Sequence, residues 1–209
     1  MSQHRIKKRD LDIFLQQIPD FKNPNASFEQ YLTPAVIASD LLFFALEQQD
    51  IFDRTIIDLG CGTGIFAIGA KWLKAKKVIA VDIDEVALTQ AKRFAEQHAL
   101  SIIFEQRDIS MCRHTADTVI MNPPFGAQKA NRHADRMFLE KAVAIAPVIY
   151  SIHLTSTLPF IRKLLSALHA TITDEKMYTF PLKASLPFHT KLVDHVTVSV
   201  LRIVHTTDA

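Results

Sequence analysis

Glycine is concentrated in one short stretch of this chain, and that concentration constrains the fold more than any other sequence feature. The 209 residues include five glycines, and four of them lie between positions 60 and 69. They follow the apolar run Thr55–Leu59 and overlap the start of a helical pattern over Ile65–Leu73. A glycine-rich turn between a buried strand and a helix is typical of doubly wound α/β folds, in which a ligand approaches the backbone closely.

The segments beyond this turn alternate between short apolar runs and helical patterns. Strands are predicted at Thr55–Leu59, Val78–Val81, Ile102–Phe104, Thr118–Met121 and Val148–Ile152, and helices at Ile65–Leu73, Glu85–His98, Arg136–Ala146 and about Leu158–Leu168. Because these strands are short and continuously apolar, we expect a mostly parallel sheet that is covered by helices on both faces.

The two ends of the chain complete the predicted fold. Ile172–Phe180 and His195–Ile203 are longer and indicate an antiparallel strand pair at the edge of the sheet. Helical spacing over about Ile6–Ile18, and Thr33 and Pro34 as an N-cap and first-turn pair, predict two helices before the first strand. The prediction is a doubly wound α/β fold with a seven-stranded, Rossmann-like sheet. One domain spans residues 1–209, and residues 1–33 form an extension packed on it.

Bulk composition excludes several classes of protein. Lys and Arg number 24 against 22 Asp and Glu, and a net charge of +2 excludes a strongly basic nucleic-acid binder but leaves a local basic face open. Cys61 and Cys112 are too few for a disulfide framework, and the nine histidines show no ligand spacing, so no metal is expected. No apolar run reaches the roughly 18 residues of a membrane span and the N-terminus is polar, so we expect a cytoplasmic protein without membrane contact.

The glycine turn also indicates the cofactor. Gly60, Gly62 and Gly64 have the spacing G-x-G-x-G, shorter than the G-x-G-x-x-G of dinucleotide binders. Asp58 places a negative charge before the turn, which is unfavourable beside a pyrophosphate and favourable beside a cation. S-adenosylmethionine carries a sulfonium and an ammonium and no phosphate. The turn therefore favours S-adenosylmethionine, with Cys61 as a small packing residue whose backbone meets it.

Acidic residues also follow the next two predicted strands. Asp82, with Ile83 beside it, ends the second strand, where a carboxylate can accept both ribose hydroxyls. Asp108 follows the third strand and could accept the adenine amino group while Ile109 packs on the ring. A lone glycine-rich turn could be only a tight turn. Acidic residues near three successive strands favour a cofactor site instead.

The tetrapeptide Asn122–Phe125 follows the fourth strand at the same edge of the sheet. An Asn-Pro step often only begins a turn. Here, however, the Asn122 side-chain oxygen and the Pro123 carbonyl can accept both N–H bonds of a planar amine and direct its lone pair out of the ring plane. Pro123 and Pro124 would hold these acceptors rigidly. Phe125 offers a face on which an extruded base could stack.

Together these features resemble class I S-adenosylmethionine-dependent amino-methyltransferases. The resemblance is most specific to the small archaeal and eukaryotic rRNA N6-adenine methyltransferases of the methyltransferase-like group, and it extends from about Leu11 to Ile203. The segments that carry it are Phe28–Pro34, Val81–Asp84, Asn122–Gln128, Tyr150–His153 and Phe188–Lys191.

The resemblance implies roles for residues that the patterns alone do not assign. Gln30 and Thr33 would close over the methionine end of the cofactor, Gly60 and Gly62 would line it, and Asn122 would lie beside it. The substrate would be an adenosine in small-subunit rRNA. The better-studied members of this family pair with a small zinc-containing activator protein, so such a partner is also implied.

Basic residues near the predicted catalytic edge are candidates for contact with RNA phosphates. A charge cluster is more often only a solvated face, and Asp135 interrupts this one. The candidates are Lys129, Arg132, Arg136, His189 and Lys191.

Other functions stay open from the sequence alone. Guanine-N2 rRNA methyltransferases share the Asn122–Phe125 signature, although Gly126 and Gln128 and the short chain favour adenine. Protein-glutamine methyltransferases use the same acceptors, but typically carry Tyr at the position of Phe125 and an extra helical domain. A non-catalytic rRNA assembly factor is a third possibility. The complete set of Asp58, Asp82, Asn122 and Phe125 favours an enzyme over such a binding protein.

Overall fold

The computed structural model describes residues 7–22, 24–25, 28–125, 134–183 and 193–205. Its α-helices are α1 (Lys8–Leu15), α2 (Ala35–Glu47), α3 (Ile65–Trp72), α4 (Glu85–Gln97), α5 (Ala134–Ile145) and α6 (Leu158–Ala167). Its strands are β1 (Thr55–Leu59), β2 (Lys77–Asp82), β3 (Ile103–Gln106), β4 (Thr118–Met121), β5 (Val148–Leu154), β6 (Ala170–Lys183) and β7 (Val193–His205). Two short 3-10 turns are η2 (Ile109–Met111) and η4 (Thr155–Thr157).

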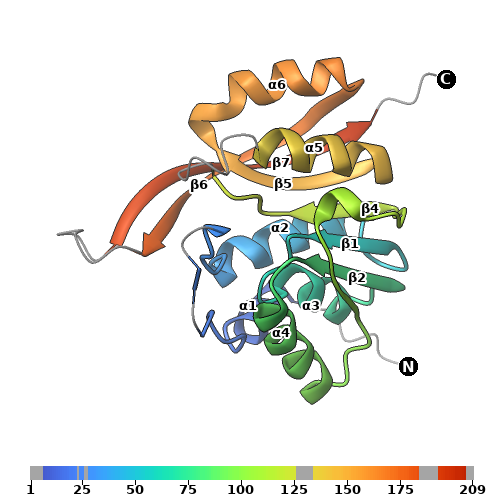
Figure 1. Ribbon diagram of the computed structural model, residues 1–209, viewed down its shortest axis with the longest axis vertical. Helices are drawn as coiled ribbons and strands as arrows, with labels where there is room; N and C mark the ends of the chain where they lie inside the picture. Colours follow the sequence, from blue (N-terminus) through green and yellow to red (C-terminus); the bar gives the residue numbers. More distant parts are fainter. Residues whose placement is uncertain (1–6, 23, 26–27, 126–133, 184–192, 206–209) are drawn as a thin grey trace.

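The strands form one seven-stranded sheet in the order β3-β2-β1-β4-β5-β7-β6 (Figure 1). Neighbours from β3 to β5 are parallel, whereas β7 is antiparallel to both β5 and β6. The chain leaves β1 toward β2 on one side and later returns to β4 on the other. The carboxyl end of β1 is therefore the topological switch point, where ligands of α/β sheets bind.

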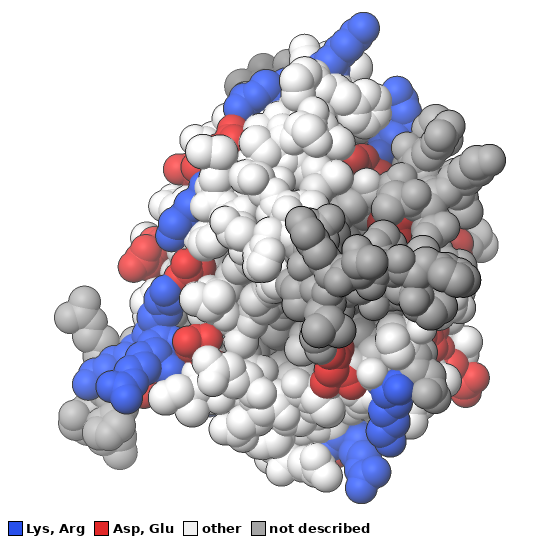
Figure 2. Space-filling model, turned by 90° about the vertical axis from the view of Figure 1, so that its left-hand side faces the viewer, with Lys and Arg blue, Asp and Glu red and all other residues white. Residues whose placement is uncertain are grey.

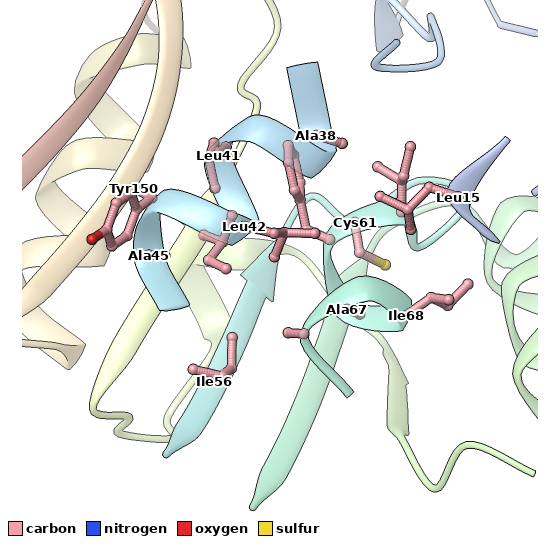
Figure 3. Close-up of a cluster of buried hydrophobic side chains, with 14 of the residues drawn as sticks. Leu15, Ala38, Leu41, Leu42, Ala45, Ile56, Cys61, Ala67, Ile68 and Tyr150 are labelled. Carbon is pink, nitrogen blue, oxygen red and sulfur yellow. The ribbon is translucent and has the colours of Figure 1, made fainter. Parts of the chain in front are cut away.

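Helices cover both faces of the sheet and bury two apolar clusters. One cluster includes residues of α1, α2, α3 and α4, and the other includes residues of α5 and α6. Ile56 of β1 belongs to the first cluster and Ile57 to the second, because successive strand residues point to opposite faces. Figure 3 shows Leu42 of α2 and Ile68 of α3 in the first cluster together with Ile56.

Helix α2 packs closely on α3, and this packing depends on a glycine. A β-carbon added at Gly69 would collide with Cδ1 of Leu42, so a larger residue there would force the Leu42 side chain to shift. Helix α1 lies against α2, where Lys8 forms an ion pair with Asp40. The N-terminal helices thereby complete the layer beside the switch point.

The fold class predicted from the sequence is confirmed, including the antiparallel C-terminal pair. Strands β6 and β7 are longer than predicted, and their hairpin extends beyond the rest of the sheet (Figure 1). The predicted start of α2 is wrong by one residue, since Pro34 is its N-cap. The Thr33 side chain does not cap the helix, because its hydroxyl accepts a hydrogen bond from Asn122 instead.

Candidate active site

A pocket of about 260 Å³ lies at the carboxyl ends of β1 to β4. Its walls come from the turns that follow these strands and from the segment of residues 28–33, which we call the strap. The predicted residues that line it are Gln30, Thr33, Gly60, Cys61, Gly62, Asp82, Ile83, Asp108, Ile109, Asn122 and Pro124. The pocket thus brings together residues from distant parts of the sequence.

The glycine turn is held by backbone hydrogen bonds to β2. The amides of Gly60 and Cys61 donate to the Val81 carbonyl over 2.8 and 3.1 Å, and the Gly62 amide donates to Asp82 Oδ2 over 2.7 Å. Gly60 has φ +69°, and a β-carbon there would lie 2.9 Å from Cε1 of Phe138. Gly64 is the left-handed N-cap of α3 and does not line the pocket. The turn therefore presents backbone to the pocket.

Asp58 is fully buried at the end of β1 and does not line the pocket. Its Oδ2 accepts the Ala67 amide over 2.8 Å, whereas Oδ1 has no hydrogen-bond partner among the described residues. Burial, together with the nearby charge of Asp82, raises the pKa of this carboxyl to about 8. A buried carboxylate with an unsatisfied oxygen is costly unless a cation comes close.

The Asp82 carboxylate binds the backbone of both the glycine turn and the turn after β2. Its Oδ2 accepts the Gly62 amide and its Oδ1 accepts the Asp84 amide over 2.9 Å. Burial raises the pKa of Asp82, and these backbone hydrogen bonds oppose that rise. Each carboxylate oxygen has a second lone pair, so both can still accept a hydroxyl from a ligand in the pocket.

The third turn follows β3. Asp108 is exposed and is the N-cap of η2, and its Oδ1 accepts hydrogen bonds from the amide and the hydroxyl of Ser110. Ile109 is 6% exposed and borders the pocket beside it. An apolar wall next to a carboxylate suits a flat ring that carries an amino group.

Two side-chain hydrogen bonds pin the strap across the pocket. Gln30 Nε2 donates to Asp84 Oδ2 over 2.6 Å on the side of β2. On the side of β4, Asn122 Nδ2 donates to Thr33 Oγ1 over 3.0 Å. The strap therefore links the turn after β2 to the tetrapeptide after β4.

The second bond also orients the Asn122 amide. Because Nδ2 is held by Thr33, the amide oxygen Oδ1 is directed elsewhere. Oδ1 is buried and has no hydrogen-bond partner among the described residues. An acceptor left unsatisfied in a buried position is unfavourable without a ligand, and a substrate N–H would satisfy it.

The remaining residues of the tetrapeptide differ in their surroundings. Pro124 lines the pocket, whereas Pro123 is buried and does not. Phe125 is only 8% exposed, and its ring stacks on Tyr31 with 5.0 Å between centroids and contacts Phe180 edge-on. The face that the sequence analysis assigns to a base is therefore covered by Tyr31.

Most of the predicted RNA-binding residues lie outside the described residues, namely Lys129, Arg132, His189 and Lys191. Arg136 of α5 is exposed, pairs with Glu140 over 3.2 Å and lies 5.7 Å from the ring centroid of Phe160. Figure 2 shows Lys and Arg around the margin of one face, without a continuous basic patch among the coloured residues. Within the described part of the chain, no group of three or more His, Cys, Asp or Glu could hold a metal ion.

Sequence reasoning missed several residues of the pocket. Phe138 lies under Gly60, Phe21 lies near Gly62, and Tyr31 covers Phe125. These aromatic residues lie in helical or loop segments, where nothing in a single sequence separates a pocket wall from core packing. The glycines at positions 60 and 62 were the available signal, because a β-carbon at either would lie within 3 Å of an aromatic ring.

The pocket fits S-adenosylmethionine on three observations. The turn after β1 carries no side chain at Gly60 and Gly62, Asp82 retains acceptor capacity for a ribose, and Asp58 has an unsatisfied oxygen close behind the turn. No phosphate-binding basic residue lies in this turn. The donor and acceptor pattern therefore suits a cationic, ribose-containing cofactor.

Comparison with known proteins agrees with this geometry. The family model for the methyltransferase small domain matches residues 35–146. A protein of Methanocaldococcus jannaschii is 39% identical over 95% of this chain and 94% of its own length. The rRNA N(6)-adenosine-methyltransferase METTL5 of Danio rerio is 35% identical over 96% of this chain and its entire length.

Solved structures extend the comparison. The crystal structure of PH1948 from Pyrococcus horikoshii, described as a candidate RNA methyltransferase, has a TM-score of 0.89 and 35% identity, covering 99% of this chain and all of that one. Magnesium protoporphyrin IX methyltransferase from Synechocystis with bound S-adenosylmethionine shares the fold, with a TM-score of 0.64 and 16% identity over 98% of this chain and all of that one. The chain belongs to the methyltransferase small domain family and is an S-adenosylmethionine-dependent N-methyltransferase.

Proposed function

We propose that this enzyme methylates N6 of an adenosine in structured RNA, most specifically in small-subunit rRNA. The observation that carries the proposal is the unsatisfied, buried Oδ1 of Asn122 beside the cofactor pocket. The full-length similarity to an enzyme named as an rRNA N(6)-adenosine-methyltransferase supports the choice of RNA and of adenine.

The proposed roles divide between the two ends of the pocket. At the cofactor end, Gly60 and Gly62 give room, Asp82 receives the ribose hydroxyls, and Asp108 with Ile109 receives the adenine. Asp58 faces the cationic methionine end through its free oxygen and ionises when that cation is present. When bound, S-adenosylmethionine supplies an electrophilic methyl group on its sulfonium.

At the substrate end, the chain prepares the amine. Asn122 Oδ1 accepts one N–H of the target amine and the Pro123 carbonyl accepts the other. Both bonds favour a nitrogen whose lone pair points out of the ring plane and is therefore nucleophilic. The hydrogen bond from Asn122 Nδ2 to Thr33 fixes the amide before substrate arrives, which is preorganisation. The methylated nitrogen is acidic and loses its proton without a strong base.

The RNA would approach from the side of the tetrapeptide. Arg136 is exposed at the start of α5, which follows the tetrapeptide in the chain. We assign it, with Lys129, Arg132, His189 and Lys191, to contacts with RNA phosphates. We also expect residues 1–209 to form one domain, since helices on both faces share a single sheet, and to work in the cytoplasm, where ribosomal subunits act.

The test is methyl transfer from labelled S-adenosylmethionine to rRNA that lacks the modification, followed by nucleoside mass spectrometry. N6-methyladenosine is the expected product. N2-methylguanosine, or label in protein glutamine instead of RNA, would refute the adenine proposal. Absence of any transfer, with cofactor binding intact and an activator supplied, would favour a non-catalytic assembly factor.

Two variants test the assignment of residues. Asn122→Ala should abolish turnover and leave the dissociation constant of the cofactor nearly unchanged, whereas Asp82→Ala should mainly weaken cofactor binding. Ser39→Ala is a matched control, because Ser39 is also a buried polar residue but lies on α2, where its hydroxyl donates to the Val36 carbonyl. Full activity of Asn122→Ala would contradict the acceptor mechanism.

A small zinc-containing activator is the proposed protein partner. Strand β3 is at one edge of the sheet, and Ile103 on it is 44% exposed. An edge strand offers unpaired backbone groups to which another chain can add. Co-expression with such a protein should give co-elution and a higher melting temperature. Separate elution and an unchanged melting temperature would refute the pairing.

A further inference from the structure

The ring of Phe125, the last residue of the tetrapeptide, is covered by two other aromatic side chains. Tyr31 stacks on Phe125 with 5.0 Å between the ring centroids and 29° between the planes. Phe180, from the β6–β7 hairpin, contacts both rings edge-on at 5.5 and 5.7 Å. With this cover in place Phe125 is 8% exposed, so no base can stack on it unless Tyr31 moves.

The hydroxyl of Tyr31, the residue that covers Phe125, is poorly hydrogen-bonded. Its hydroxyl oxygen is buried and lies near the backbone amide of Phe125, but makes no hydrogen bond of good geometry with the described residues. A buried hydroxyl with a poorly aligned partner recovers only part of its lost interaction with water, which offsets part of the stacking energy. The second residue of the strap, Glu29, has φ +50°, a left-handed conformation that non-glycine residues rarely adopt. The closed arrangement is therefore one that a ligand could displace at modest cost.

The two anchors of the strap lie on either side of Tyr31. Gln30 reaches Asp84, next to the cofactor side of the pocket, and Thr33 receives Asn122 on the catalytic side. Tyr31 and Asn122 both line the cofactor pocket, and the Tyr31 hydroxyl and Asn122 Oδ1 are both buried without a well-placed partner among the described residues. A planar base that carries an amine would satisfy the second atom and release the first to solvent or to the substrate.

We propose that Tyr31 is a place-holder for the target base: its phenol ring occupies the stacking position on Phe125 and is displaced when the base enters. This inference rests on the proposed function, because it assumes that a base is the substrate. The place-holder keeps the apolar face of Phe125 from water in the absence of RNA. It also makes base entry a competition, so that only a base whose amine reaches Asn122 replaces the tyrosine effectively.

The first experiment observes Tyr31 directly. The chain has three tyrosines, so the intact protein labelled with 3-fluorotyrosine should give three fluorine resonances. Tyr31→Phe assigns one of them. The protein is saturated with S-adenosylhomocysteine, which fills the cofactor site, and is then titrated with adenosine. We expect the Tyr31 resonance to move while those of Tyr150 and Tyr178 stay in place.

The second experiment measures competition. Tyr31→Ala removes the stacked ring, so the base no longer has to displace it. The interaction energy of one aromatic pair corresponds to a fall in KM for RNA of roughly 2- to 10-fold. Tyr31→Phe is the matched control, because it keeps the stacked ring and removes only the poorly paired hydroxyl, so KM should not fall. Thermal unfolding of both variants checks that they are folded, and the fluorine experiment itself observes the wild-type ring and needs only Tyr31→Phe for its assignment.

The outcomes separate this proposal from the proposed function. Movement of Tyr31 with guanosine and not adenosine would support the place-holder and refute adenine as the substrate. An unmoved Tyr31 resonance in a protein that forms N6-methyladenosine would overturn the place-holder and leave the function intact. A rise in KM for Tyr31→Ala would also overturn it, because Tyr31 would then be a wall of the base site.

Discussion

The buried carboxyl of Asp58 gives the sharpest test of the electrostatics, and the change to make is Asp58→Asn. The side chain is fully buried, with Oδ2 on the Ala67 amide and Oδ1 unpaired. Asparagine has nearly the same shape, and its oxygen can still accept the Ala67 amide. The substitution therefore removes the ionisable group and leaves the packing in place.

The magnitude follows from the pKa of the group. Burial raises it from 3.8 to about 8, so between these values the folded chain binds a proton that the unfolded chain has released. The stability of the wild-type protein must then fall as pH rises through this window, by about 1.4 kcal/mol per pH unit. The accumulated cost is on the order of 5 kcal/mol at pH 8 and constant above it. Asp58→Asn carries none of this cost.

The assay is urea unfolding of the cofactor-free protein at several pH values between 5 and 8. The free energy of unfolding of Asp58→Asn should exceed that of the wild type, and the difference should grow with pH. Asp174→Asn is the control, because Asp174 is exposed on β6. A difference that is independent of pH would refute the reasoning, since Asp58 would then not change its protonation between the folded and unfolded states.

The same residue links cofactor binding to protons. If the cationic end of S-adenosylmethionine comes near Asp58, its binding must lower the pKa of the carboxyl and release a proton at pH 7. Calorimetry in two buffers of different ionisation enthalpy should detect close to one released proton for the wild type and none for Asp58→Asn. Equal proton release by both proteins would show that the cationic end of S-adenosylmethionine does not bind near Asp58.

Three further substitutions test the framework of the site. Thr33→Val removes the hydroxyl that receives Asn122 and should lower kcat by about fivefold, roughly 1 kcal/mol, in steady-state methyl transfer. Gly60→Ala forces a side chain into a left-handed position against Phe138, so we expect calorimetric cofactor affinity to fall and thermal unfolding to show a loss of about 1–3 kcal/mol. Asp50→Ala leaves its arginine partner on β7 and the Tyr150 hydroxyl without their shared acceptor, and should cost about 2–4 kcal/mol in urea unfolding without changing cofactor affinity. Unchanged values in the named assays would contradict the corresponding contacts.

Much of the fold was predictable because its signals are local. Strands such as Val78–Val81 are buried on both faces, so their sequences are continuously apolar and short. Gly60 and Gly62 have positive φ angles that other residues rarely adopt, and their spacing is visible in the sequence. The carboxyl ends of parallel strands share one edge, so acidic residues at or after strand ends could be assigned to one site from order alone.

Element boundaries were less predictable where a side chain has two possible partners. Thr33 precedes Pro34 and matches a helix-capping pattern, yet its hydroxyl receives the Asn122 amide from far along the chain. The extra length of β6 and β7 has a different cause. Pairing between these two strands continues past the rest of the sheet, and a strand pattern cannot report how far its partner reaches.

By itself, the sequence determined the class of fold, the edge of the sheet at which ligands bind, and the cofactor, because each depends on local conformation, strand order and the charge near one turn. Only the tertiary structure decided which side chains of the site contact one another and which of their polar atoms lack a partner. The strap anchors at Gln30 and Thr33, the unsatisfied oxygens of Asp58 and Asn122, and the cover of Tyr31 over Phe125 all depend on contacts between segments that are distant in the sequence. Such contacts follow from packing geometry, which residue order alone does not specify.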